Sequence, residues 1–194
     1  KVHKITQNNP AYPNVYVLHG DLLPEEMNGL YNHPKVKAHI TFTKGEGFGR
    51  PLAEASLSGK PIIASNWSGH TDFLHPQYTL LLPGKLRAIH KSAQMKGMLN
   101  EGSQWFYIDA AYASQVMKDV FKNYKKYLDF CRKQPQHMRT NFSFDKMTEL
   151  LDTYLKENIT QMPKPMSLQL PKLKKKQETK SELPALKLPK LKKL

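Results

Sequence analysis

Two glutamates eight residues apart, Glu46 and Glu54, flank a glycine-rich stretch and have the chemistry to bind a ligand. Carboxylates accept hydrogen bonds from hydroxyl groups but repel phosphates, so we expect them to bind the hydroxyl groups of a sugar. Between them, Gly45, Gly47 and Gly49 can adopt positive φ and let backbone N–H groups approach a ligand. The stretch therefore predicts a site for a ligand rich in hydroxyl groups.

The flanking sequence predicts elements that would hold this stretch at the end of a strand. One apolar run, residues 36–42, precedes it, and a second, residues 61–65, follows it. Good helix formers begin at Arg50 and Pro51, and the start of a helix attracts phosphate. This order of strand, loop, helix and strand predicts the βαβ unit of a parallel sheet, in which ligands bind beyond the carboxyl ends of the strands.

A family resemblance rests on the order Glu46-Gly-Phe-Gly-Arg-Pro-Leu-Ala-Glu54, followed by Gly-Lys-Pro-Ile-Ile-Ala-Ser. This order resembles the E-x7-E signature of retaining glycosyltransferases of family 4 with the GT-B fold. The resemblance is tight over residues 14–74 and looser up to about residue 158. It implies an α/β fold, the C-terminal, donor-binding domain of such an enzyme. That domain is a Rossmann-like parallel sheet flanked by helices, here incomplete at its N-terminus.

The resemblance also implies roles for individual residues. Glu46 would be the catalytic residue and contact the donor sugar, and Glu54 would bind the ribose. The other implied donor-binding positions are Lys44, Gly45, Gly47, Phe48, Gly49, Arg50 and Leu52. Backbone groups at 47–49 would contact the sugar, those around Arg50 and Leu52 the diphosphate, while Lys44 either meets the phosphates or points to solvent. Neither a metal ion nor another cofactor is expected, and no Asp-x-Asp motif occurs.

We therefore expect a hexosyltransferase that moves a sugar from a nucleotide-diphosphate donor to an acceptor hydroxyl, in glycan or glycoconjugate synthesis. The acceptor, a glycan, lipid or protein, would bind an N-terminal domain that this sequence lacks, so residues 1–194 alone are expected to be inactive. Two alternatives stay open. One is another GT-B enzyme, such as a sugar-nucleotide epimerase or a phosphorylase. The other is a non-catalytic binding protein that acts through a basic tail. P-loop, zinc-protease and dinucleotide-binding motifs are absent.

The charge is concentrated at the C-terminal end of the chain. Residues 162–194 hold ten lysines against Glu178 and Glu182, and so carry +8 of the net charge of +14. Frequent prolines and repelling lysines predict a domain at 1–160 and a disordered tail at 161–194. The tail is expected to contact an anionic surface, or else to be a solubilising segment without a partner. No membrane-spanning stretch is visible, and we expect a cytoplasmic location, with attachment to a membrane surface left open.

Local patterns predict the remaining elements. We expect a buried strand at 15–18, a short helix from Pro24, a last short strand at 79–84, broken helix after it, and an extended piece at 105–108. Asp109 should cap a long helix that runs to about residue 132 and buries Cys131, and Ser143 should cap a final helix. His70 is expected to be a surface loop histidine, because no metal partner accompanies it.

Overall fold

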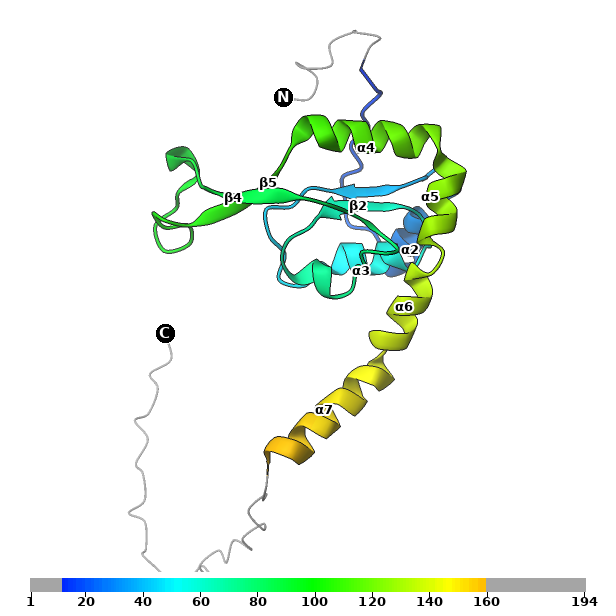
Figure 1. The fold of residues 1–194 in the computed structure, drawn as a ribbon, viewed down its shortest axis with the longest axis vertical. Helices are drawn as coiled ribbons and strands as arrows, with labels where there is room; N and C mark the ends of the chain where they lie inside the picture. The colour runs from blue at the N-terminus through cyan, green and yellow to red at the C-terminus, as the bar shows by residue number, and fades with distance from the viewer. Residues whose placement is uncertain (1–11, 160–194) are drawn as a thin grey trace, which may run out of the picture. The chain divides into compact units, whose positions relative to one another are not determined.

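The structure, a computed structural model, describes residues 12–159 (Figure 1). The chain divides into two compact units, Lys1–Tyr154 and Leu155–Leu194, and the first holds every strand of the described part. The predicted tail at 161–194 lies outside the described residues. The fold described below is therefore that of the first unit, together with the end of its last helix.

A three-stranded parallel sheet forms the centre of the first unit. Its strands are β1 (His39–Thr41), β2 (Ile62–Ser65) and β3 (Leu80–Leu82), in the order β1-β2-β3. The register pairs Ile40 with Ile63 and Ala64 with Leu81. All four residues of β2 are buried, as is usual for a strand of a parallel sheet that is covered on both faces. The predicted βαβ unit and the last short strand are thereby confirmed.

Helices cover both faces of this sheet. Alternate residues of β2 point to opposite faces, so each set packs against a different helix. On one face, Ile62 and Ala64 pack with Leu52 of α3 (Arg50–Ser56). On the other face, Ile63 packs with Val120 of α4 (Ala110–Lys122). Figure 1 shows α4 and α3 on either side of β2. The structure is thus a mixed α/β fold whose parallel sheet lies between helices, in agreement with the predicted fold class at this level.

The long helix predicted after Asp109 is confirmed at its start but is interrupted. The Asp109 carboxylate accepts a 2.7 Å hydrogen bond from the backbone N–H of Tyr112, as a capping residue does. Asn123 leaves helical geometry, with φ −113° and ψ 34°, and separates α4 from α5 (Tyr124–Cys131). Cys131 is 1% exposed, which confirms the predicted buried thiol. A further helix that the sequence did not predict, α6 (Gln134–Asn141), follows it.

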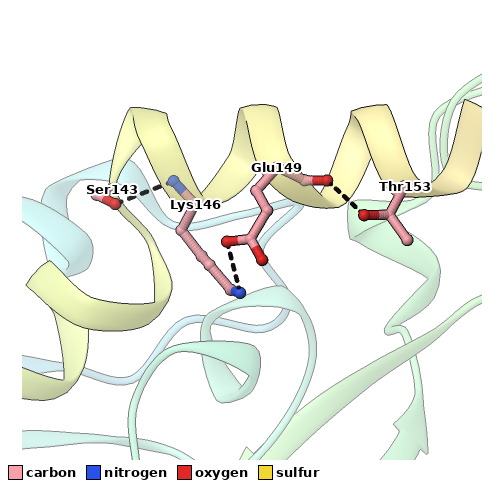
Figure 2. Close-up of polar contacts among 4 residues, drawn as sticks. All are labelled: Ser143, Lys146, Glu149 and Thr153. Atoms are coloured by element: carbon pink, nitrogen blue, oxygen red, sulfur yellow. Dashed lines mark hydrogen bonds and ion pairs between the residues drawn. The ribbon is translucent and has the colours of Figure 1, made fainter.

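The final helix, α7 (Phe144–Asn158), is capped as predicted. Ser143 Oγ accepts a 3.2 Å hydrogen bond from the N–H of Lys146, whose Nζ forms a 2.9 Å ion pair with Glu149 (Figure 2). Thr153 Oγ1 donates to the carbonyl oxygen of Glu149 one turn earlier. Apolar residues of this helix are exposed: Met147, Leu150, Leu151, Tyr154 and Leu155. The interactions seen for α7 are therefore its cap and the contacts within the helix, rather than burial of its apolar residues.

Two segments differ from the predictions. Residues 15–18 were expected to form a buried strand, but they pair with no strand in residues 12–159, and Tyr16 is 87% exposed. A parallel strand needs a hydrogen-bonded neighbour, and these residues have none in the described part of the chain. The broken helix predicted after residue 84 is a hairpin instead, in which β4 (Gly84–Ala88) pairs antiparallel with β5 (Gln104–Ile108). The extended piece at 105–108 and the short helix α2 (Pro24–Asn32) are confirmed.

Candidate functional site

The glycine-rich stretch lies at the carboxyl edge of the sheet and is fastened to a second loop there. It follows β1, and the loop 66–72 follows β2 at the same edge, because the two strands are parallel. The backbone N–H of Glu46 donates a 2.7 Å hydrogen bond to Ser68 Oγ. The N–H of Gly69 donates a 3.1 Å bond to the carbonyl oxygen of Glu46. Both backbone groups of Glu46 are therefore held by the second loop, and its carboxylate remains for a ligand.

Ser68 holds this contact in a strained conformation. Its φ is 72° and its ψ is −164°, and it is the residue other than glycine with positive φ in the described part of the chain. That region of backbone space is nearly restricted to glycine, and strain of this kind is concentrated at functional sites. We did not identify Ser68 as a site residue from the sequence. The Ser68-Gly69 pair indicates a turn, but not the partner of its hydroxyl group.

Two glycines are required for the two loops to meet. A Cβ atom added to Gly69 would overlap with the carbonyl group of Gly47. Gly49 caps α3 with φ 90°, and a Cβ atom there would lie 3.1 Å from the Cβ of His70. Gly45 and Gly47 do not have positive φ, so the expected use of positive φ holds for Gly49 alone among the three glycines of the stretch. A Cβ atom on Gly47 would meet no atom of residues 12–159 within 4 Å.

His70 is fully buried, so the predicted surface loop histidine is wrong. Its Nε2 lies 2.6 Å from the carbonyl oxygen of Ser65. Because a carbonyl oxygen can only accept, Nε2 carries the hydrogen. Nδ1 is buried and has no hydrogen-bond partner within residues 12–159. The short helix η1 (Gly69–Asp72) turns the ring back against the end of β2, and Gly49 packs on it.

Two cavities separate the predicted site residues into two groups. The first, of about 310 Å³, is lined by Glu46, Gly49 and Leu52 together with residues of β1. The second, of about 330 Å³, is lined by Arg50 and Glu54 together with residues of α2. Tyr31 lines both cavities. The predicted sugar-binding and ribose-binding carboxylates therefore face neighbouring cavities on either side of one aromatic side chain.

The start of α3 offers fewer free N–H groups than the sequence suggested. The N–H groups of Leu52 and Ala53 both donate to the carbonyl oxygen of Gly49, at 2.9 and 3.0 Å. Pro51 has no N–H group, and the side chain of Leu52 is in the core. A phosphate at this end of the helix would therefore need side chains, or N–H groups of the loop, as its donors.

Arg50 and Glu54 form an ion pair on the surface of α3. Arg50 Nε lies 3.1 Å from Glu54 Oε1, and the two side chains are 84% and 41% exposed. Exposed pairs of this spacing on a helix stabilise it only slightly, by about 0.3–0.5 kcal/mol. The pair therefore contributes little to the stability of the fold.

Lys44 and Phe48 point to different parts of the structure. The ammonium of Lys44 lies 3.5 Å from the centroid of the Tyr107 ring. The backbone carbonyl oxygen of Lys44 accepts a 3.3 Å hydrogen bond from the N–H of Phe106. Lys44 is therefore directed toward the β4–β5 hairpin. Phe48 is half exposed and contacts the buried ring of Phe73, with 4.9 Å between the centroids.

Burial changes the titration of two residues that line the first cavity. Burial, and then the negative charge of Glu54, raise the pKa of Tyr31, so its hydroxyl group stays protonated and can donate a hydrogen bond. Burial, and then the positive charge of Lys60, lower the pKa of His39. Both residues are therefore neutral near pH 7, and the cavity wall they form is uncharged.

Comparisons with known proteins identify no related protein. The chain matches no protein-family model, no curated protein sequence and no solved structure. Within residues 12–159, no helix is long and apolar enough to cross a membrane. In the same part of the chain, no three His, Cys, Asp or Glu side chains gather where they could hold a metal ion.

Proposed function

We propose that this chain supplies the donor-binding half of a retaining, metal-independent glycosyltransferase with a GT-B fold. The observation that carries the proposal is the fastening of Glu46, which lines a cavity of about 310 Å³, by Ser68 and Gly69. A carboxylate with a fixed backbone beside a cavity can position the hydroxyl groups of a sugar. Its place at the carboxyl edge of a parallel sheet is where α/β folds bind nucleotides and related ligands.

In this function the two carboxylates and Tyr31 have tasks that their positions allow. Glu46 would accept hydrogen bonds from the donor sugar in the first cavity, and Glu54 would accept them from the ribose in the second. Tyr31, which lines both cavities, would contact the donor where it passes from one cavity to the other, and its neutral hydroxyl group could donate a hydrogen bond to it. Catalysis would depend on holding the donor and on stabilising the departing diphosphate with positive charge, for which Lys44 and Arg50 lie on either side of the glycines.

The test is donor binding and turnover with matched variants. We would measure binding of UDP-, GDP- and ADP-sugars to residues 1–194 by ligand-observed NMR, and nucleotide release by the complete polypeptide with an acceptor panel. Glu46→Gln should lower both by at least about tenfold, since it removes a charged acceptor of hydrogen bonds. Glu54→Gln should weaken binding of the nucleotide. The control Glu157→Gln removes the same charge from α7 and should change neither.

The same assay separates the alternatives. Conversion of the donor without an acceptor would indicate an epimerase of the same fold. Normal binding and turnover in both Glu46→Gln and Glu54→Gln would contradict the proposal. The remaining alternative is a non-catalytic binding protein that acts through its basic tail. Removal of residues 162–194 should abolish the function of a binding protein of this kind, whereas a glycosyltransferase should keep its transfer activity.

A further inference from the structure

A cationic and aromatic face lies on the β4–β5 hairpin, next to the glycine-rich stretch. We call it the Tyr107 face, and it consists of Lys44, Lys85, Arg87, Trp105 and Tyr107. The antiparallel register places Lys85 directly opposite Tyr107 and Arg87 directly opposite Trp105. Residues that are directly opposite in such a pair share one face of the sheet. All four hairpin side chains therefore lie on the same side.

The cations of this face gather around one ring. The Lys44 ammonium lies 3.5 Å and the Arg87 guanidinium 5.8 Å from the centroid of Tyr107. Both distances are within the range of cation–π attraction. Lys44, Lys85 and Arg87 are exposed, whereas Trp105 and Tyr107 are half-buried. The result is an apolar floor with three positive charges at its surface.

No carboxylate balances these charges in the described part of the chain. Two ion pairs within residues 12–159 join Arg50 to Glu54 and Lys146 to Glu149. Neither involves a cation of the Tyr107 face. Like charges that lie close together repel one another, so the arrangement favours an anion as its missing partner.

The face is attached firmly to the rest of the fold. The N–H of Phe106 donates to the carbonyl oxygen of Lys44, and the Phe106 ring stacks on Trp67 with 5.7 Å between centroids and 7° between planes. Gly84 allows the chain to pass against this ring, since a Cβ atom there would lie 2.7 Å from it. The hairpin is thus anchored to the loops that follow β1 and β2, and Tyr107 is held in place next to Phe106.

The position of the face is that of a ligand site. Lys44 follows β1, Trp67 follows β2 and Gly84 follows β3, so the face is assembled at the carboxyl edge of the sheet. Open parallel sheets bind ligands at this edge. The N–H groups of Leu52 and Ala53 at the start of α3 are already in use, so an anion at this edge needs other donors, which the cationic side chains of the Tyr107 face can supply.

We infer that the Tyr107 face binds the phosphate group of a small ligand. Arg87 can bind phosphate oxygens in a bidentate manner, Lys44 and Lys85 add point charges, and the rings of Tyr107 and Trp105 contact the body of the ligand. This site does not depend on the proposed function. If both hold, the phosphate belongs either to the diphosphate of the donor or to a phosphorylated acceptor.

The test is calorimetric titration of the full chain at about 150 mM salt with inorganic pyrophosphate, UDP, glucose 6-phosphate and glucose. The variant Lys44→Gln/Lys85→Gln/Arg87→Gln should bind phosphate compounds at least about tenfold more weakly, because it removes three charged donors. The control Lys118→Gln/Lys122→Gln/Lys125→Gln removes the same charge from exposed positions of α4 and α5. It should stay within about twofold of the parent chain, as it retains every contact to the ligand.

The panel of compounds identifies the source of the phosphate. Tighter binding of pyrophosphate and UDP than of glucose 6-phosphate supports the donor diphosphate, and the reverse order supports a phosphorylated acceptor. An equal loss in both triple variants, or no binding of any phosphate compound by the parent chain, would overturn the inference. So would displacement of these compounds by a single-stranded oligonucleotide whose binding depends on the same three residues and is much tighter.

Glu46→Gln keeps this result separate from the proposed function. It should leave the binding of inorganic pyrophosphate unchanged, because pyrophosphate has no sugar for Glu46 to contact. Loss of turnover in Glu46→Gln without any binding of pyrophosphate would support the glycosyltransferase and overturn the phosphate site. Binding of pyrophosphate, with no turnover of any sugar nucleotide by the complete polypeptide, would do the opposite.

Discussion

The backbone N–H of Glu46 donates a 2.7 Å hydrogen bond to the side-chain oxygen of Ser68, twenty-two residues further along the chain. This bond joins the loop after β1 to the loop after β2, and it fixes the backbone of the glutamate that we propose to contact a sugar. Ser68 adopts a backbone conformation normally reserved for glycine while it does so. The geometry of the site is therefore maintained at some cost in stability.

Replacement of Ser68 should reveal that cost. Ser68→Ala loses the hydrogen-bond acceptor and keeps the strain, so we expect it to lower the free energy of unfolding by about 1–2 kcal/mol. Ser68→Gly also loses the acceptor but removes strain of about 1–3 kcal/mol. The glycine variant should therefore be more stable than the alanine variant by about 1–3 kcal/mol in urea denaturation. Equal stability of the two would show that the conformation is not strained.

Gly69 and Gly47 form a matched pair for testing the contact between the two loops. Gly69→Ala places a Cβ atom against the carbonyl group of Gly47, so the loops must separate. We expect this variant to lose about 2 kcal/mol or more of stability, together with any binding of a sugar nucleotide. Gly47→Ala meets no atom within 4 Å and should stay within about 1 kcal/mol of the parent. Similar losses in both variants would contradict the close approach seen here.

The ion pair between Arg50 and Glu54 should matter little for folding. Both side chains are exposed, so we expect Arg50→Ala to lower the free energy of unfolding by no more than about 0.5 kcal/mol. Its thermal midpoint should therefore stay close to that of the parent. A large shift would mean that the pair stabilises the fold, and loss of ligand binding in Glu54 variants would then need another explanation.

Cys131 should react slowly in the folded protein. Burial raises the pKa of its thiol to about 11 from an ordinary 9.0, so the reactive thiolate is about 100-fold rarer near pH 8. Since the chain has one cysteine, a thiol reagent such as dithionitrobenzoate gives a direct measurement. We expect little reaction in buffer and one equivalent in denaturant. Fast reaction in buffer would mean that the region between α5 and α6 opens readily.

His39 should make the fold less stable in acid. Its pKa is lowered in the folded state by burial and by Lys60, so the unfolded chain takes up the proton more readily. The contribution of neutral His39 to the stability of the folded state is complete above the unfolded pKa of about 6.5, and it is lost as the pH falls through the folded pKa. We expect urea denaturation to show a smaller difference between pH 7.5 and pH 5.5 in His39→Gln than in the parent. His137, whose pKa is also lowered, accounts for part of the remaining difference.

The sequence by itself predicted the elements whose signals are local. The two apolar runs around the glycine-rich stretch are strands β1 and β2, Asp109 and Ser143 cap helices, and Cys131 is buried. Such features depend on the spacing of apolar residues and on contacts three or four residues apart. A single sequence contains that information directly.

The tertiary structure decided which distant residues meet. Residues 15–18 have the composition of a strand but no strand paired with them among the described residues, and the segment after residue 84 becomes a hairpin because β5 pairs with it. His70 is buried because η1 folds against β2, and Lys44 faces Tyr107, sixty-three residues away, because the hairpin anchors on its loop. Strand pairing and contacts between loops join residues that are far apart in the chain. Their partners are set by the packing of the whole unit, which no local pattern encodes.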